Sequence, residues 1–146
     1  MDSKLFFCVI LFLIFPTTAL ALDPVFTDGK NTAILGYDPV AYFQRAKPIR
    51  GKKEITHEWM GAIWRFESQG NREKFAADPE TYAPQYGGYC AWAVSQGYTA
   101  SIDPRAWNIY RGKLYLNFSK SIQRRWEKDK EGHIQRANKN WPRLLR

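Results

Sequence analysis

Two stretches of alternating apolar and polar residues constrain the fold of this chain more than any other feature. EITHEWM and AIWRFES flank Gly61, and WNIYRGKLYLNF turns at Arg111-Gly112. Alternation with a period of two on both sides of a glycine-containing turn predicts a β-hairpin. The sequence therefore predicts two short antiparallel hairpins.

Helix signals follow or precede each hairpin. Ser68 or Asn71 can cap a helix through REKFAA, and Asp78-Pro79 starts a further turn of helix. Gly87 and Gly88 break the chain before CAWAVSQ, which reads as a helix headed by Cys90.

Ser119 is a suitable N-cap for one long final helix through SIQRRWEKDKEGHIQRANKNW. We recognise no internal repeat in the sequence. These elements predict an α+β fold, with a small antiparallel sheet built from two short hairpins, packed helices and a long C-terminal helix.

The first residues have the pattern of a secretory signal. Lys4 is followed by the apolar run LFFCVILFLIF, and Ala19 and Ala21 form a small-x-small cleavage site. The run is too short to span a bilayer. We therefore expect residues 1–21 to be a signal peptide and residues 22–146 to form a single domain, which is periplasmic or secreted after cleavage.

Cleavage would leave one cysteine. Cys8 lies in the leader, so the exported chain keeps Cys90 alone and cannot form an internal disulfide. An odd thiol in an oxidising compartment is a buried small apolar residue, half of an intermolecular bridge, a metal ligand or a redox group. The residues themselves leave these alternatives open.

The positive charge gathers near the C-terminus. The net charge is +8, and the segment after residue 112 holds ten Lys or Arg against three acids. Aromatic and apolar side chains in this segment recur at near-helical spacing and should pack inward; they are Ile122, Trp126, His133, Ala137 and Trp141.

The outer face of the final helix then carries the charge, including Arg124, Arg125 and Lys128. This face is either merely solvated or makes weak contact with an anionic envelope surface. Export argues against nucleic acid as a partner.

Soft and borderline metal ligands are few. Ile55, His57 and Trp59 share one face of a predicted strand, so His57 is either a core histidine or a ligand. Thiolate, imidazole and thioether together suit Cu(I), which makes Cys90, His57 and Met60 the candidate metal set. With only His133 in addition, a four-ligand structural zinc is excluded after cleavage.

The neighbourhood of Cys90 supports two opposite expectations. A cysteine in the first turn of a helix faces unpaired N–H groups, which favour the thiolate. Gly87 and Gly88 would let backbone or a ligand approach closely. Tyr89 and Trp92 can equally cover the sulfur, and burial would then suppress its ionisation.

Four segments carry a resemblance to a known family. GYDPVAYF, HEWMGAIWRFES, NREKFAADPETYAPQYGGYCAWAVSQG and YLNFSKSIQRRWEKD resemble the exported branch of the YHS-domain family, over about residues 33–142. The resemblance implies a compact α+β fold related to small metal-binding modules. It also implies heavy-metal handling, most often of copper, for members with a full cysteine set.

This chain departs from that cysteine set. The positions matching the family's metal-binding cysteines are Ala41, Glu67 and Gly70 or Asn71. The family's thiolate site therefore does not carry over. The chain also resembles proteins with selenocysteine at the position matching Cys90, which implies a nucleophilic, redox or soft-metal role there.

Three functions remain open from the sequence. The first is an exported module that binds copper or another soft metal through Cys90. The second is a redox protein whose Cys90 reacts with an external partner thiol, and the third is a non-catalytic envelope interaction domain. No nucleophile, base and orienting acid can be grouped, and no phosphate loop or dinucleotide motif is present, so we assign no catalytic residue beyond Cys90 as the redox candidate.

Overall fold

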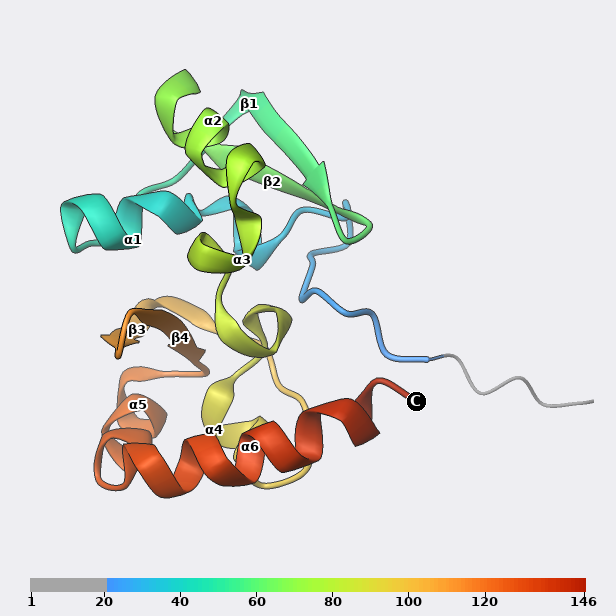
Figure 1. The fold of residues 1–146 in the computed structure, drawn as a ribbon, viewed down its shortest axis with the longest axis vertical. Helices are drawn as coiled ribbons and strands as arrows, with labels where there is room; N and C mark the ends of the chain where they lie inside the picture. Colours follow the sequence, from blue (N-terminus) through green and yellow to red (C-terminus); the bar gives the residue numbers. More distant parts are fainter. Residues whose placement is uncertain (1–20) are drawn as a thin grey trace, which may run out of the picture.

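The computed structural model of the protein describes residues 21–146 and shows a mixed α+β fold, as predicted. The predicted signal peptide lies outside the described residues, apart from Ala21. Two halves are stacked along the long axis of the molecule (Figure 1). Within residues 21–146, no helix combines the length and apolar character needed to cross a membrane.

The two halves contain the same sequence of elements. The first half consists of a 3₁₀ turn η1 (Ile34–Gly36), α1 (Pro39–Arg45), β1 (Lys52–Trp59), β2 (Ala62–Phe66), α2 (Gln69–Ala77) and α3 (Pro79–Tyr82). The second half consists of η2 (Gln85–Gly88), α4 (Ala91–Ser95), β3 (Asp103–Tyr110), β4 (Lys113–Asn117), α5 (Lys120–Glu127) and α6 (Lys130–Leu144).

Both predicted hairpins are present, and each forms its own two-stranded antiparallel sheet. The turn residues Met60 and Gly61 have φ values of 49° and 75°, and Arg111 and Gly112 have 50° and 75°. Positive φ at both central residues is the type I′ geometry that matches the twist of a hairpin. The hairpins do not join into one sheet.

The two halves also agree in details of their strands and helix caps. Each hairpin has an irregularity early in its first strand, after Lys52 and after Asp103. A serine side chain caps the helix after each hairpin, and an aspartate caps the helix after that. The fold is thus an internal duplication, and our reading of the sequence as free of repeats was wrong.

The predicted long C-terminal helix is present as α6, but its predicted start at Ser119 was wrong, because a separate helix, α5, precedes it. α5 ends at Glu127, and Asp129 has a non-helical φ of −150° while its side chain accepts a hydrogen bond from the N–H of Gly132. Asp129 therefore acts as the N-cap of a new helix, α6. The predicted inward stripe is confirmed at its centre, because Trp126, His133 and Ala137 are buried.

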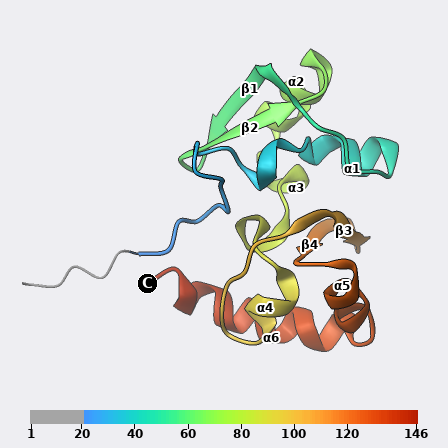
Figure 2. The ribbon, with the colours of Figure 1, turned by 180° about the vertical axis from the view of Figure 1, so that it is seen from behind.

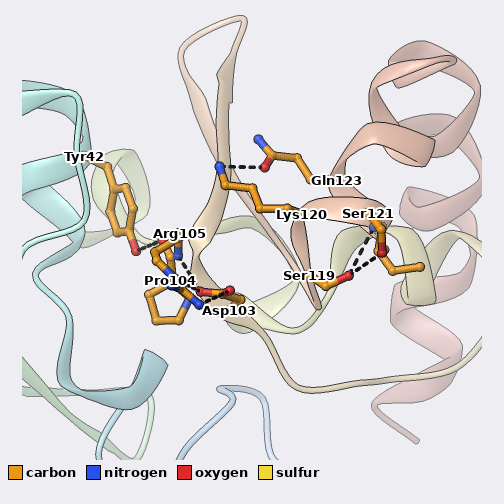
Figure 3. Close-up of polar contacts among 9 residues, drawn as sticks. Tyr42, Asp103, Pro104, Arg105, Ser119, Lys120, Ser121 and Gln123 are labelled. Carbon is orange, nitrogen blue, oxygen red and sulfur yellow. Dashed lines mark hydrogen bonds and ion pairs between the residues drawn. The ribbon is translucent and has the colours of Figure 1, made fainter.

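The halves share a buried cluster and are joined by hydrogen bonds. Trp64 and Phe75 of the first half belong to the same buried cluster as Cys90 and Leu114 of the second. The hydroxyl of Tyr42 in α1 donates to the carbonyl oxygen of Pro104 in β3 at 2.8 Å (Figure 3). The β1–β2 hairpin and α6 lie at opposite ends of the molecule in both views (Figures 1 and 2).

Candidate functional site

Cys90 is the N-cap residue of α4 and is only 1% exposed. Its Sγ accepts a hydrogen bond from the backbone N–H of Phe118 at 3.2 Å. The thiol also lies 3.6 Å from Oδ1 of Asn117, to which it donates. The sulfur therefore has one donor and one acceptor beside it.

An apolar pocket of about 230 Å³ reaches Cys90. Its other lining residues are all aromatic or aliphatic: Trp92, Ala93, Tyr98, Ala100, Phe118 and Ile122. Tyr98 and Phe118 are 48% and 52% exposed, which places large apolar groups at the solvent side of the pocket. Cys90 is thus buried and still forms part of a cavity wall.

The electrostatics of the site favour the neutral thiol. Burial raises the pKa of Cys90 above its ordinary value, and this effect exceeds the opposing influence of the N–H groups of Ala93, Phe118 and Trp92. Of the two expectations from the sequence, suppression by burial therefore outweighs stabilisation of the thiolate.

Gly87 and Gly88 serve packing around the site. Both have positive φ, 61° and 86°. A Cβ at Gly87 would collide with the carbonyl oxygen of Pro24, and one at Gly88 would lie 2.5 Å from Cγ2 of Ile34. These glycines allow other parts of the chain to approach η2 closely.

The duplication gives Cys90 a structural counterpart in Asp38, the N-cap of α1. The carboxylate of Asp38 is 0% exposed and accepts four hydrogen bonds. Oδ1 accepts from the N–H groups of Val40 and Ala41 at 2.8 and 3.2 Å. Oδ2 accepts from the N–H of Glu67 at 2.9 Å and from Nδ2 of Asn71 at 2.8 Å.

The second half keeps part of this arrangement around sulfur. Phe118 follows β4 as Glu67 follows β2, and its N–H donates to Cys90 as that of Glu67 donates to Asp38. Ile122 stands in the place of Asn71 and makes the pocket wall apolar. The second half thus has a thiol beside a cavity where the first half has a buried carboxylate.

The side-chain amide of Asn117 lies beside Cys90. It is 0% exposed, and its Oδ1 accepts a hydrogen bond from the N–H of Trp92 at 3.0 Å. This bond fixes the orientation of the amide, because the flipped amide would set Nδ2 against the N–H donor. Nδ2 has no acceptor among the residues that the structure describes, although the same amide contacts Cys90.

The other two predicted metal ligands lie elsewhere. The ring of His57 in β1 packs edge-on against Phe75, with 6.1 Å between centroids, and Met60 is 50% exposed at the hairpin turn. Neither residue lines the Cys90 pocket. β1 and α4 lie in different halves of the molecule (Figures 1 and 2).

The residues around Cys90 do not fit copper. Cu(I) requires at least two soft ligands, whereas Cys90 is surrounded by an amide, backbone groups and apolar side chains. Over residues 21–146, no group of three or more His, Cys, Asp or Glu is placed to hold a metal ion.

His133 has a packing role. Its Nδ1 lies 2.9 Å from Oγ of Ser95 in α4 and 3.0 Å from the guanidinium of Arg136. Burial, followed by the charge of Arg136, lowers the pKa of His133. The neutral ring therefore fastens α6 to α4.

Arg124, Arg125 and Lys128 are exposed on α5 and its C-terminal end, as expected for the outer face. None of the ion pairs formed within the described part of the chain includes them. The geometry leaves these three cations free for contact with solvent or with an anionic surface.

The sequence reading missed the pocket, Asn117 and the relation between Cys90 and Asp38. One signal for that relation was present, because GYDPVAYFQ and GYCAWAVSQ share glycine, tyrosine, alanine and glutamine at corresponding positions. Comparisons with protein-family models, with curated proteins and with solved structures found no match.

Proposed function

We propose that this protein is an exported thiol redox protein in which Cys90 reduces a small apolar hydroperoxide. The observation that carries the proposal is the position of Cys90. Its sulfur occupies a place that holds an oxyanion in the other half, and it forms the wall of an apolar cavity.

The reaction begins with attack of Sγ on the outer oxygen of the hydroperoxide. The thiol first loses its proton, the thiolate forms a sulfur–oxygen bond as the oxygen–oxygen bond breaks, and the departing alkoxide takes up the released proton to become an alcohol. The sulfur is oxidised by two electrons to a sulfenic acid, and the peroxide is reduced. The N–H of Phe118, which donates to Sγ, is a donor available to the new oxygen.

An external thiol must complete the cycle. Within the described chain, Cys90 is the one free cysteine, so the sulfenic acid has no resolving partner there. A partner thiol condenses with the sulfenic acid to a mixed disulfide and water, and a second thiol then releases reduced Cys90. This step agrees with the external partner thiol expected from the sequence.

The surroundings of Cys90 also select the substrate. An apolar lining favours a hydroperoxide with an aromatic or branched aliphatic body over a charged one. Because the thiol is neutral at rest, only the minor thiolate fraction reacts at neutral pH. The site is therefore suited to slow, selective oxidation.

The two other functions that the sequence left open fit Cys90 less well or do not involve it. A soft-metal site lacks a second soft ligand beside Cys90. Contact with an anionic envelope surface through Arg124, Arg125 and Lys128 needs no cysteine, so it is compatible with the redox role and is tested separately by charge reversal.

The experiment follows the intact mass of the protein after exposure to an aromatic hydroperoxide, with a sulfenic-acid trap present. We expect one trapped group on Cys90 and none in Cys90→Ser. Ala100→Trp should fill the pocket and slow trapping about tenfold or more, equivalent to the loss of about 1.4 kcal/mol of transition-state stabilisation.

Ala76→Trp is the matched control, because Ala76 is exposed on α2 and lies outside the pocket. Trapping at the wild-type rate in Ala76→Trp supports access through the pocket. Equal rates in Ala100→Trp and the wild type would reject that route, and an untrapped Cys90 in folded wild type would reject the redox function.

A further inference from the structure

A second cleft, of about 650 Å³, lies in the first half and is lined by Asp28, Gly29, Lys30, Lys53 and Arg65. None of these residues takes part in the Cys90 site. The cleft therefore raises a separate question, namely why three cations face one cavity.

Arg65 is the most informative of these residues. A Cβ at Gly36 would lie 3.5 Å from both Cδ and Nη1 of Arg65, so the side chain runs close along the η1 backbone. Its Nε is buried and has no acceptor among the described residues. A buried donor of a charged group without a partner is costly, and in a native protein it points to a bound water or ligand.

The corresponding position in the second half does not hold an arginine. Arg65 in β2 corresponds to Leu116 in β4, which is 0% exposed, and Lys53 corresponds to Pro104. The second half thus has an apolar residue where the first has a cation. Folding of the unit does not require an arginine at this position.

The loop that carries Lys30 is held against the hairpin. Oδ1 of Asp28 accepts hydrogen bonds from the N–H groups of Lys30 and Thr32, both at 2.9 Å. The N–H of Ala33 donates to the carbonyl oxygen of Ile63 in β2 at 2.9 Å. Lys30, Lys53 and Arg65 are therefore presented by a fixed loop and two paired strands.

The charges in the cleft do not cancel. Burial opposes ionisation of Asp28, but hydrogen bonds from Thr32 and Lys30 and the charge of Arg65 together hold its pKa below the ordinary value. Asp28 is thus ionised at neutral pH and offsets one of three cations. None of Lys30, Lys53 and Arg65 forms an ion pair within residues 21–146.

We propose that Lys30, Lys53 and Arg65 form a binding site for a phosphate group in its dianionic form. Two negative charges would balance the excess of cations in the cleft, which a single carboxylate would not. The planar guanidinium of Arg65 matches the geometry of phosphate oxygens, and the lysines add two further charges. The phosphate belongs either to a soluble molecule or to a lipid headgroup, and the site is independent of the Cys90 reaction.

The experiment titrates ¹⁵N-labelled protein with inorganic phosphate at constant ionic strength and follows the Nε–Hε signal of Arg65 by NMR. We expect a saturable shift of this signal. Lys53→Gln should weaken binding about tenfold, equivalent to about 1.4 kcal/mol, because it removes one charged contact to the phosphate. Lys52→Gln is the matched control, because the neighbouring Lys52 is exposed and does not line the cleft.

The test uses Lys53→Gln and does not depend on Arg65→Gln. Lys53 is exposed, so its replacement leaves the packing of the fold unchanged. A second arm sediments the protein with vesicles that contain phosphatidic acid, against neutral vesicles. Cleft-dependent binding of soluble phosphate or of these vesicles supports the site and identifies the source of the group. Equal losses in Lys52→Gln and Lys53→Gln would overturn it, as would an unshifted Arg65 signal together with no sedimentation on phosphatidic acid vesicles.

Discussion

At the scale of single residues, the most informative comparison is between Asp38 and Cys90. Both are N-caps, and both accept a hydrogen bond from the N–H that follows a hairpin. Asp38 is fully satisfied by four donors and has a structural role. Cys90 has fewer hydrogen-bond partners and lines an apolar cavity. The two positions therefore share their backbone geometry, but only Cys90 is placed to meet a ligand.

Replacing Asp38 by asparagine tests the structural half of this comparison. The new Nδ2 would face the N–H of Glu67 or the amide of Asn71, so we expect a loss of about 3 kcal/mol in the free energy of unfolding. Urea denaturation measures it. Glu73→Gln, an exposed change in α2, should stay within about 0.5 kcal/mol of wild type, and an equally small effect of Asp38→Asn would contradict the assignment.

The pH dependence of Cys90 tests its burial. Because the folded pKa is raised, the thiolate fraction and the alkylation rate should keep increasing above about pH 8.5, the ordinary thiol pKa. The same raised pKa means that the thiol contributes stability below the unfolded-state pKa, and this contribution is lost as pH increases beyond it. Protein unfolded in urea serves as the control, and an inflection at the same pH in both states would show that burial has no effect.

At the scale of elements, local patterns predicted most of the fold. Alternation and the Gly61 and Gly112 turns defined both hairpins, and Ser68 and Ser119 marked two helix starts correctly. Those features depend on neighbouring residues alone. The helix break at Asp129 was missed because apolar spacing continues across it.

The Cys90 pocket and the predicted metal ligands show what the sequence did not predict. The sequence grouped Cys90, His57 and Met60 by their chemistry. In the structure Cys90 belongs to the second half, whereas His57 and the exposed Met60 belong to the first. Ile122, from α5, becomes a wall of the Cys90 pocket only through tertiary packing. Such contacts join residues that are distant in the sequence, so local sequence patterns do not predict them.

Glycine substitutions test the packing of the connecting elements. Gly88→Ala combines a φ of 86° with a close contact to Ile34, so we expect a loss of about 2 kcal/mol. Gly70→Ala, inside α2 with open space around it, should instead stabilise the protein by about 0.5–1 kcal/mol. Thermal unfolding compares the two variants, and effects of the same sign would contradict the described packing.

At the scale of the whole molecule, the two halves share one buried cluster, and the second half has a further cluster of its own. Trp64 and Leu114, from different halves, belong to one buried cluster, and Tyr42 bridges to Pro104. Neither half encloses that shared cluster alone, so we expect the halves to unfold together.

Tyr42→Phe tests this coupling. Loss of the hydroxyl leaves the carbonyl of Pro104 without that donor and should cost about 1–2 kcal/mol. Native-state hydrogen exchange should show the same loss for the most protected amides of β2 and β4, which lie in different halves. A loss confined to the first half would show that the two units are independent.

The measurement that tests the central claim most directly compares two oxidants on the same folded protein. Oxidation of Cys90 by an aromatic hydroperoxide and by hydrogen peroxide is followed by intact mass at equal concentrations. Because the apolar pocket should bind the aromatic body, we predict a rate about tenfold higher for the aromatic hydroperoxide, equivalent to about 1.4 kcal/mol. Equal rates, or oxidation that occurs only after unfolding, would contradict the proposal that the pocket delivers substrate to Cys90.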